Sequence, residues 1–279
     1  MNSGNSIIDL LQSALDVWSG KLSEIWDLIS TSPENFHGGT VFQIITGIHD
    51  SLKAIAYALL VLFFVMGVIK TTTDFRDLKR PEQAFKLFLR FTVAKVIVDS
   101  SMELMLAVYR IVQGIIDRVS AGSSGITAAA LVLPDVLKNK ISACSFLESI
   151  PLWLVSVLLV AVVFVLSVLM VLTVYSRFFS LFMYSAIAPV PLASYASEGS
   201  SQIGRHFLKS YASVCLQGAI VILSCVIYSA IAVSPPSVSD SGTAVTMVWT
   251  YMGELVFNLL ILVSAVRLSD RVVKEMIGV

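Results

Sequence analysis

The sequence predicts an all-α integral membrane protein with about five transmembrane helices, an N-terminal amphipathic helix and one proline-broken hairpin. Three observations support this fold class. Hydrophobic residues make up 56% of the chain and charged residues only 14%, which is outside the usual range of soluble domains. Several apolar runs are long enough to cross a bilayer. Basic residues gather in the links between these runs, as they do on the inner side of membrane proteins.

Residues 1–40 are predicted to form an extracytoplasmic amphipathic helix and a turn. No Lys or Arg precedes Lys21, so the segment lacks the basic start of a secretory signal and is expected to be retained. Its apolar residues recur at alternating spacings of three and four, which is typical of a helix with one apolar stripe. The stripe packs on its own protein or lies in the headgroup layer, or it forms a seam between neighbouring subunits. Its members are Ile8, Leu11, Leu15, Trp18, Leu22, Ile25 and Ile29.

Five spans are predicted inside a transmembrane domain that covers residues 41–267, with a short cytoplasmic tail at 268–279. The run from Pro151 to Tyr175 holds no charge and is long enough to span a bilayer with some tilt. The predicted spans are 44–69, 87–112, 151–175, 210–233 and 244–266.

The basic residues predict the orientation of these spans. They cluster after the first span, at Arg177, before the fourth span and at the end of the chain. If all of these clusters lie inside, five crossings place the N-terminus and the loop 119–150 outside and the C-terminus inside. This topology holds only if the segment 178–200 does not cross the membrane.

Residues 178–200 carry Pro189 and Pro191 within the small-residue run SAIAPVPLAS. A proline removes a backbone donor and clashes with the carbonyl four residues back, so two prolines are unsuited to a plain spanning helix. The segment is therefore predicted to be a re-entrant or interfacial hairpin on the cytoplasmic side, where protein or water satisfies its carbonyls. The alternative is a sixth span kinked at Pro189, which would place a basic cluster outside.

The predicted span 87–112 is unusual because it is charged. Lys95, Asp99 and Glu103 follow one another at i, i+4 and i+8, so they share one helix face. Each such charge costs about 2.5–3.5 kcal/mol at a membrane centre, so this helix cannot face lipid all round. Either Lys95 pairs with Asp99 and Glu103 meets a polar group of another span, or the stripe lines a water-filled lumen or a subunit interface. Candidate partners in later spans are Glu254, Asn258 and Gln217.

The link after the first span combines a basic cluster with Pro81 at a helix start and an aromatic stripe. Its basic residues are a positive-inside signal with headgroup contacts, or they form a docking face for a cytoplasmic partner. The candidate docking residues are Arg76, Lys79, Arg80, Lys86 and Arg90.

The sequence holds no recognisable constellation of catalytic or cofactor-binding residues. The three histidines lie far apart, no Walker loop, HExxH or GxSxG motif occurs, and Asp99 has no second intramembrane aspartate to pair with. Cys144, Cys215 and Cys225 lack metal-ligand spacing. We therefore expect no enzyme activity, no metal and no cofactor.

Three segments of the chain resemble the TrbL-like conjugal transfer proteins: the basic link DFRDLKRPEQAFKLFLRFTVAK, the charged helix ending MELMLAVYRIVQGI, and APVPLAS after a long apolar span. The resemblance runs over nearly the whole chain, and it is to the short version from Gram-positive integrative conjugative elements in particular. Such proteins are the polytopic inner (plasma) membrane channel component of type IV secretion systems. Many members carry a large soluble domain, where this chain has only a short loop and tail.

The resemblance implies a multi-pass protein of a bacterial plasma membrane that forms a homo-oligomeric ring, five-fold in related machines. The ring would be the platform and channel of a conjugative DNA-transfer apparatus. Its implied partners are membrane lipids, stalk or cell-wall-side subunits, cytoplasmic ATPases and DNA in transit. The alternative is a small secondary transporter or ion channel, with the intramembrane charges and the broken segment as its substrate site. Such transporters usually have two repeated halves, but the sequence shows one broken segment and no internal repeat.

Overall fold

The computed structural model describes residues 3–72, 81–122, 133–231 and 243–278. Every regular element in these ranges is a helix, which confirms the all-α fold class. The elements are α1 (Ser3–Ser30), the 3₁₀ helix η1 (Phe36–Gly39), α2 (Thr40–Thr72), α3 (Pro81–Asp99), α4 (Ser101–Gly122), α5 (Asp135–Ser142), α6 (Phe146–Ile187), α7 (Pro189–Leu192), the 3₁₀ helix η2 (Ala193–Ala196), α8 (Ser201–Ile231) and α9 (Ala244–Ile277).

Four of the described helices, α2, α6, α8 and α9, are long and apolar enough to cross a membrane. They overlap the spans predicted at 44–69, 151–175, 210–233 and 244–266. The other predicted span, 87–112, is divided between α3 and α4, which meet at Ser100. These two helices are set apart by their charges, because each carries several acidic and basic residues where the other four have long uncharged stretches.

The third predicted span is longer than expected. Instead of ending at Tyr175, α6 continues to Ile187. Arg177 was expected as one of the inner-side charges that follow this span, but it lies inside the helix with only 2% of its surface exposed. The chain breaks at 188–200 instead of from 178, because a proline disturbs only the helical turn that precedes it and the first proline is Pro189.

The chain divides into two compact units. The first unit comprises Met1–Ser30, Ile116–Tyr175 and Ile220–Ser269, and the second comprises Thr31–Ile115, Ser176–Ala219 and Asp270–Val279. In the first unit α1 packs on α5, the short helix of the loop predicted to lie outside. The Leu133 backbone N–H just before α5 donates a hydrogen bond of 3.2 Å to the side chain of Gln12 in α1.

The apolar stripe of α1 is largely covered within a single chain. The subunit seam that the sequence analysis offered for this stripe stays a prediction. Ile8 and Leu22 are half-buried. At most 2% of the surface of each other member is exposed: Leu11, Leu15, Trp18, Ile25 and Ile29.

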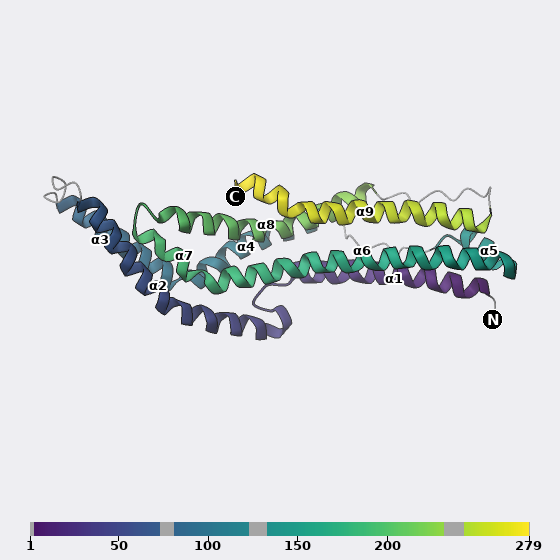
Figure 1. Ribbon diagram of the computed structural model, residues 1–279, viewed down its shortest axis with the longest axis horizontal. Coiled ribbons are helices and arrows are strands. Elements are labelled where there is room, and N and C mark those ends of the chain that lie inside the picture. The colour runs from purple at the N-terminus through teal and green to yellow at the C-terminus, as the bar shows by residue number, and fades with distance from the viewer. Residues whose placement is uncertain (1–2, 73–80, 123–132, 232–242, 279) are drawn as a thin grey trace. The chain divides into compact units, whose positions relative to one another are not determined.

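In the second unit, α7 and η2 lie against both α2 and α3 (Figure 1). The proline-broken segment is thus packed between helices of its own chain. Gly67 of α2 permits this close approach, because a Cβ atom there would lie 3.3 Å from the Oγ of Ser197. The described part of α3 starts at Pro81, and proline is well suited to the first position of a helix.

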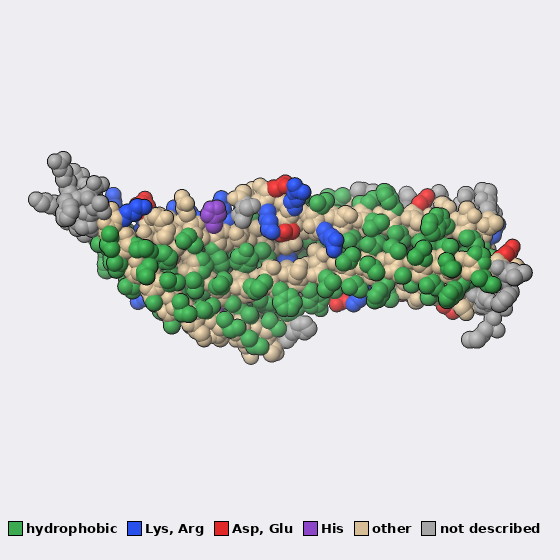
Figure 2. Space-filling model, viewed as in Figure 1, with side chains coloured by type: hydrophobic (Ala, Val, Ile, Leu, Met, Phe, Trp, Pro, Cys, Tyr) green, Lys and Arg blue, Asp and Glu red, His purple; other side chains and the backbone are tan. Residues whose placement is uncertain are grey.

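Hydrophobic side chains cover much of the surface visible in Figure 2. On α2, Ile55, Leu62 and Val65 expose 53%, 51% and 47% of their surface. Soluble monomers rarely leave so large a continuous apolar surface uncovered, whereas lipid covers it without cost. The exposed apolar surface of α2 is therefore that of a membrane helix.

Candidate functional site: a buried polar cluster at a helix break

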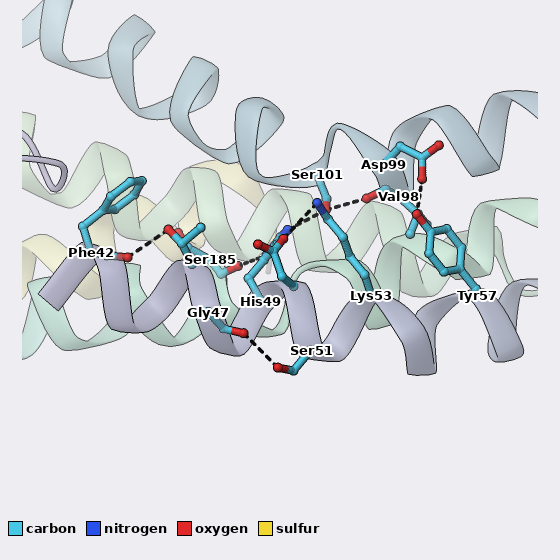
Figure 3. Close-up of polar contacts among 12 residues, drawn as sticks. Phe42, Gly47, His49, Ser51, Lys53, Tyr57, Val98, Asp99, Ser101 and Ser185 are labelled. Carbon is cyan, nitrogen blue, oxygen red and sulfur yellow. Dashed lines mark hydrogen bonds and ion pairs between the residues drawn. The ribbon is translucent and has the colours of Figure 1, made fainter.

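A buried polar cluster joins α2, α4 and α6 in the second unit (Figure 3). Its centre is His49 of α2, whose side chain is fully buried. The Nδ1 atom of His49 lies 2.7 Å from the backbone oxygen of Ser185 in α6. Its Nε2 atom lies 3.0 Å from the hydroxyl of Ser101, the first residue of α4. One imidazole ring therefore connects three helices.

Pro189 explains why the Ser185 carbonyl is available to His49. In an α-helix this carbonyl would accept a hydrogen bond from the N–H of residue 189, but proline has none. The backbone at Ala188 is still helical, with φ −48° and ψ −41°, so the carbonyl keeps its helical direction. His49 supplies the missing donor. A buried carbonyl left without a partner would cost about 1–3 kcal/mol.

The hydrogen-bond partners determine the proton positions on His49. Because the Ser185 carbonyl can only accept, Nδ1 carries a proton. In the neutral ring, Nε2 accepts from the Ser101 hydroxyl. In the charged ring, Nε2 donates to that hydroxyl, which in turn donates to the carbonyl of Val98 at 2.7 Å. Both ring nitrogens therefore have partners in either charge state.

A second polar contact joins α2 to the end of α3. The hydroxyl of Tyr57 donates a hydrogen bond to the carboxylate of Asp99. Within α2, one turn before Tyr57, Lys53 forms an ion pair of 3.1 Å with Asp50. Tyr57 lies within the candidate span Thr40–Lys70, so its hydrogen bond holds Asp99 beside this apolar helix. Even so, 38% of the Tyr57 surface is exposed and Asp99 is also exposed.

The predicted polar stripe is exposed on the single chain. Lys95, Asp99 and Glu103 are all in the exposed class, and we name these three residues the charged strip. Among the described residues no ion pair joins Lys95 to Asp99, whose partner is Tyr57 instead. Of the partners proposed from later helices, Gln217 is buried in the second unit, whereas Glu254 and Asn258 belong to the first unit.

Serine side chains hold the turn that follows Pro191. The Ser194 hydroxyl donates to the Pro191 carbonyl at 2.7 Å and accepts from the Gly204 N–H at 2.9 Å. The Ser200 hydroxyl donates to the Ser194 carbonyl at 3.0 Å. The chain thus supplies its own partners to irregular backbone, which is the condition for such backbone at membrane depth.

Arg90, one of the predicted docking residues, is bound to this turn. Its Nε donates to the Tyr195 carbonyl at 3.2 Å, and its guanidinium lies 3.5 Å from the carboxylate of Glu198. Lys86 is exposed on α3. The remaining docking residues, Arg76, Lys79 and Arg80, lie outside the described residues.

His49, Tyr57 and Ser101 are not among the site residues predicted from the sequence. One signal was available, because His49, Lys53 and Tyr57 recur every four residues within the first predicted span and so share a helix face. No local pattern links residue 49 to residue 185. That contact depends on how α2 packs against α6.

The cluster offers hydrogen bonds and charge. Within the described ranges, no three His, Cys, Asp or Glu side chains come together in a group that could hold a metal ion. The arrangement can fix α2, α4 and α6 in register through His49, and it can present the charged strip at the depth of a membrane helix.

Comparison with protein families gives one match. A family model described as "TrbL/VirB6 plasmid conjugal transfer like protein" matches residues 19–189, more than half of the 279-residue chain. The matched range includes α2, α3, α4 and α6, and it ends at Pro189. No curated protein and no solved structure matched the chain. The chain therefore belongs to the TrbL/VirB6 plasmid conjugal transfer-like family, and it is a component of a conjugal transfer, or type IV secretion, apparatus.

Proposed function

We propose that this chain is the homo-oligomeric membrane platform and channel subunit of a conjugative DNA-transfer machine. It acts through architecture, by surrounding or flanking the path of the substrate, and not through catalysis. Family membership supports the place in the machine. The charged strip supports the oligomer.

The observation that carries this proposal is a set of exposed charges at the depth of an apolar helix. Asp99 is bonded to Tyr57, inside the candidate span of α2, and Lys95 and Glu103 lie one turn to either side of it. Each charge facing lipid would cost about 2.5–3.5 kcal/mol. A single chain surrounded by lipid could not support that cost three times over, so water or protein must cover the strip. A second copy of the chain, or the lumen that several copies enclose, provides that cover.

In the proposed topology the chain crosses the membrane five times, with the N-terminus outside and the C-terminus inside. The proline-broken turn lies beside the C-terminal end of α2 and the first half of α3, through Gly67 and Arg90 respectively. The link between these helix ends carries the basic cluster. Both are therefore on the inner side under the positive-inside rule. The α3–α4 pair then crosses outward as one broken span, with its break at Ser100.

In this topology the partners divide between the two sides of the plasma membrane. The inner side presents the exposed Lys86 and Glu198 to cytoplasmic ATPases. The outer side presents α1 and α5 to stalk or cell-wall-side subunits. DNA in transit would pass along the shared axis of the ring.

Cysteine cross-linking and accessibility measurements test this proposal. We would introduce single cysteines by Lys95→Cys, Asp99→Cys and Glu103→Cys in a chain whose native cysteines are replaced. Matched controls are Ile55→Cys and Leu62→Cys, which lie on the exposed apolar surface of α2. The strip positions should cross-link between copies or react with a water-soluble thiol reagent, and the controls should do neither. Identical behaviour of strip and control positions in a monomeric particle would refute the proposal.

One observation favours a second candidate function, a small secondary transporter or ion channel. The α3–α4 break lies beside the His49 cluster, and broken helices with buried polar groups are typical of substrate sites in transporters. A transporter needs no ring of copies. Solute or ion flux through a monomer or dimer in liposomes, with loss of that flux in His49→Ala, would favour this function over the platform.

A further inference from the structure

Arg177 is a buried cation inside the longest apolar helix. Only 2% of its surface is exposed, and in the described part of the chain no carboxylate lies within ion-pair distance of it. Its Nε donates to the carbonyl of Val214 and its Nη2 to the carbonyl of Cys215, both at 3.3 Å. Both acceptors belong to the backbone of α8. The planar guanidinium fork therefore reaches two consecutive carbonyls of a neighbouring helix, which suits arginine and not lysine.

Gly218 provides the space for this guanidinium. A Cβ atom at position 218 would lie 2.3 Å from the Cζ of Arg177 and 2.4 Å from both of its terminal nitrogens. No side chain other than hydrogen fits there while Arg177 keeps its place. Glycine is otherwise unfavourable inside a helix relative to alanine, so the close approach of Arg177 gives a specific reason for Gly218.

The contacts of Arg177 close the open end of a helical hairpin. Its first arm is the end of α6 and its second arm is the start of α8, with the turn at 188–200 between them. In the middle, the ring of Tyr184 lies 5.5 Å from that of Phe207 and 6.2 Å from that of Tyr211, centroid to centroid. Near the turn, Ser194 bonds to Gly204. The contacts thus pair progressively more distant residues from the turn to Arg177, as in two antiparallel arms.

We infer that Arg177 and Gly218 form an interhelical lock that fixes the hairpin 177–218 as one rigid element. The lock holds the two arms at the end opposite the turn, so the proline-broken turn is presented to α2 and α3 by a preorganised support. Arg177 is thereby a structural cation. This inference does not depend on the oligomer or on the channel.

A double-variant experiment tests the lock. Gly218→Ala forces the guanidinium out, so it should lower the Tm of the purified full-length protein by more than about 4 °C. It should also reduce bismaleimide cross-linking between cysteines introduced at 184 and 207, in a chain whose native cysteines are replaced by alanine. In Arg177→Ala/Gly218→Ala the alanine methyl occupies space that the guanidinium left, so most of the lost Tm and cross-linking should return. The matched control is Gly114→Ala, a helical glycine with open space around its Cβ position.

Two results would overturn the lock. One is Gly218→Ala behaving like Gly114→Ala. The other is a double variant that recovers none of the Tm and cross-linking lost in Gly218→Ala. If Gly218→Ala does not accumulate in the membrane at all, accumulation of the double variant supports the lock, and its failure to accumulate contradicts it.

Discussion

His49 is expected to stabilise the fold because it replaces the helical hydrogen bond that Pro189 removes. The dependence of this stabilisation on Pro189 can be measured. In His49→Ala the carbonyl of Ser185 loses its donor inside a buried site. In Pro189→Ala the new N–H can bond to the same carbonyl, because the backbone at Ala188 is already helical. We therefore expect His49→Ala to be harmful in the wild-type chain and much less harmful in the Pro189→Ala chain.

The size of the effect follows from the unpaired carbonyl. Leaving it buried without a partner costs about 1–3 kcal/mol, which corresponds to a fall in Tm of about 2–6 °C for a chain of this length. The cavity left by the imidazole ring adds to the loss in both backgrounds, so it cancels when the two losses are subtracted. The difference between backgrounds then isolates the hydrogen bond to Ser185.

The assay is thermal unfolding of the four variants of this cycle in one detergent at one pH. Pro191→Ala is the matched control, because Pro191 frees the carbonyl of Ile187, to which no bond from His49 is made. His49→Ala should cost as much in that background as in the wild-type chain. Equal losses of Tm in the wild-type, Pro189→Ala and Pro191→Ala backgrounds would refute the explanation given for the proline.

Three further outcomes are expected. Tyr57→Phe removes the donor to Asp99, so it should lower oligomer yield and transfer frequency, as Asp99→Asn should. The double variant should be no worse than either single variant, and additive losses would contradict a shared role. Burial, and secondly the carboxylate of Glu148, raise the pKa of the Cys144 thiol. Since the thiolate is the reactive form, an impermeant maleimide should label Cys144 in intact cells slowly at pH 7 and about tenfold faster for each pH unit above it. Labelling only after permeabilisation would place Cys144 inside. The ion pair between Arg110 and Glu34 is 3.0 Å long but its arginine is 69% exposed, so Glu34→Ala should change unfolding free energy by no more than about 1 kcal/mol, and a larger loss would show that the pair is desolvated in the assembly.

Most of the fold was predictable from the sequence because membrane helices are encoded locally. Apolar length alone located α2, α6, α8 and α9, and the prolines located the break. The burial of Arg177 inside α6 was not predictable in this way, because it depends on carbonyls of α8 that accept hydrogen bonds from its Nε and Nη2 atoms. An arginine in a sequence gives no sign of whether backbone from another helix will receive it.

The candidate site was predictable only in part, for the same physical reason. The i, i+4 spacing identified Lys95, Asp99 and Glu103 as one helix face. It did not identify Tyr57 as the partner of Asp99 or His49 as the donor to Ser185, since both contacts join residues far apart in the chain. Carbonyls freed by proline are a useful guide here. Such a carbonyl needs a donor from elsewhere in the chain when it is buried, and buried histidines and arginines are the first side chains to consider.

The mass and symmetry of the particle purified in mild detergent test the central claim most directly. We would determine the mass by mass photometry and the symmetry from two-dimensional class averages of the full-length protein. The proposed platform predicts a ring of several copies, with the charged strip at a subunit contact or facing the central axis. A stable monomer, with Lys95, Asp99 and Glu103 covered by neither protein nor water, would contradict it.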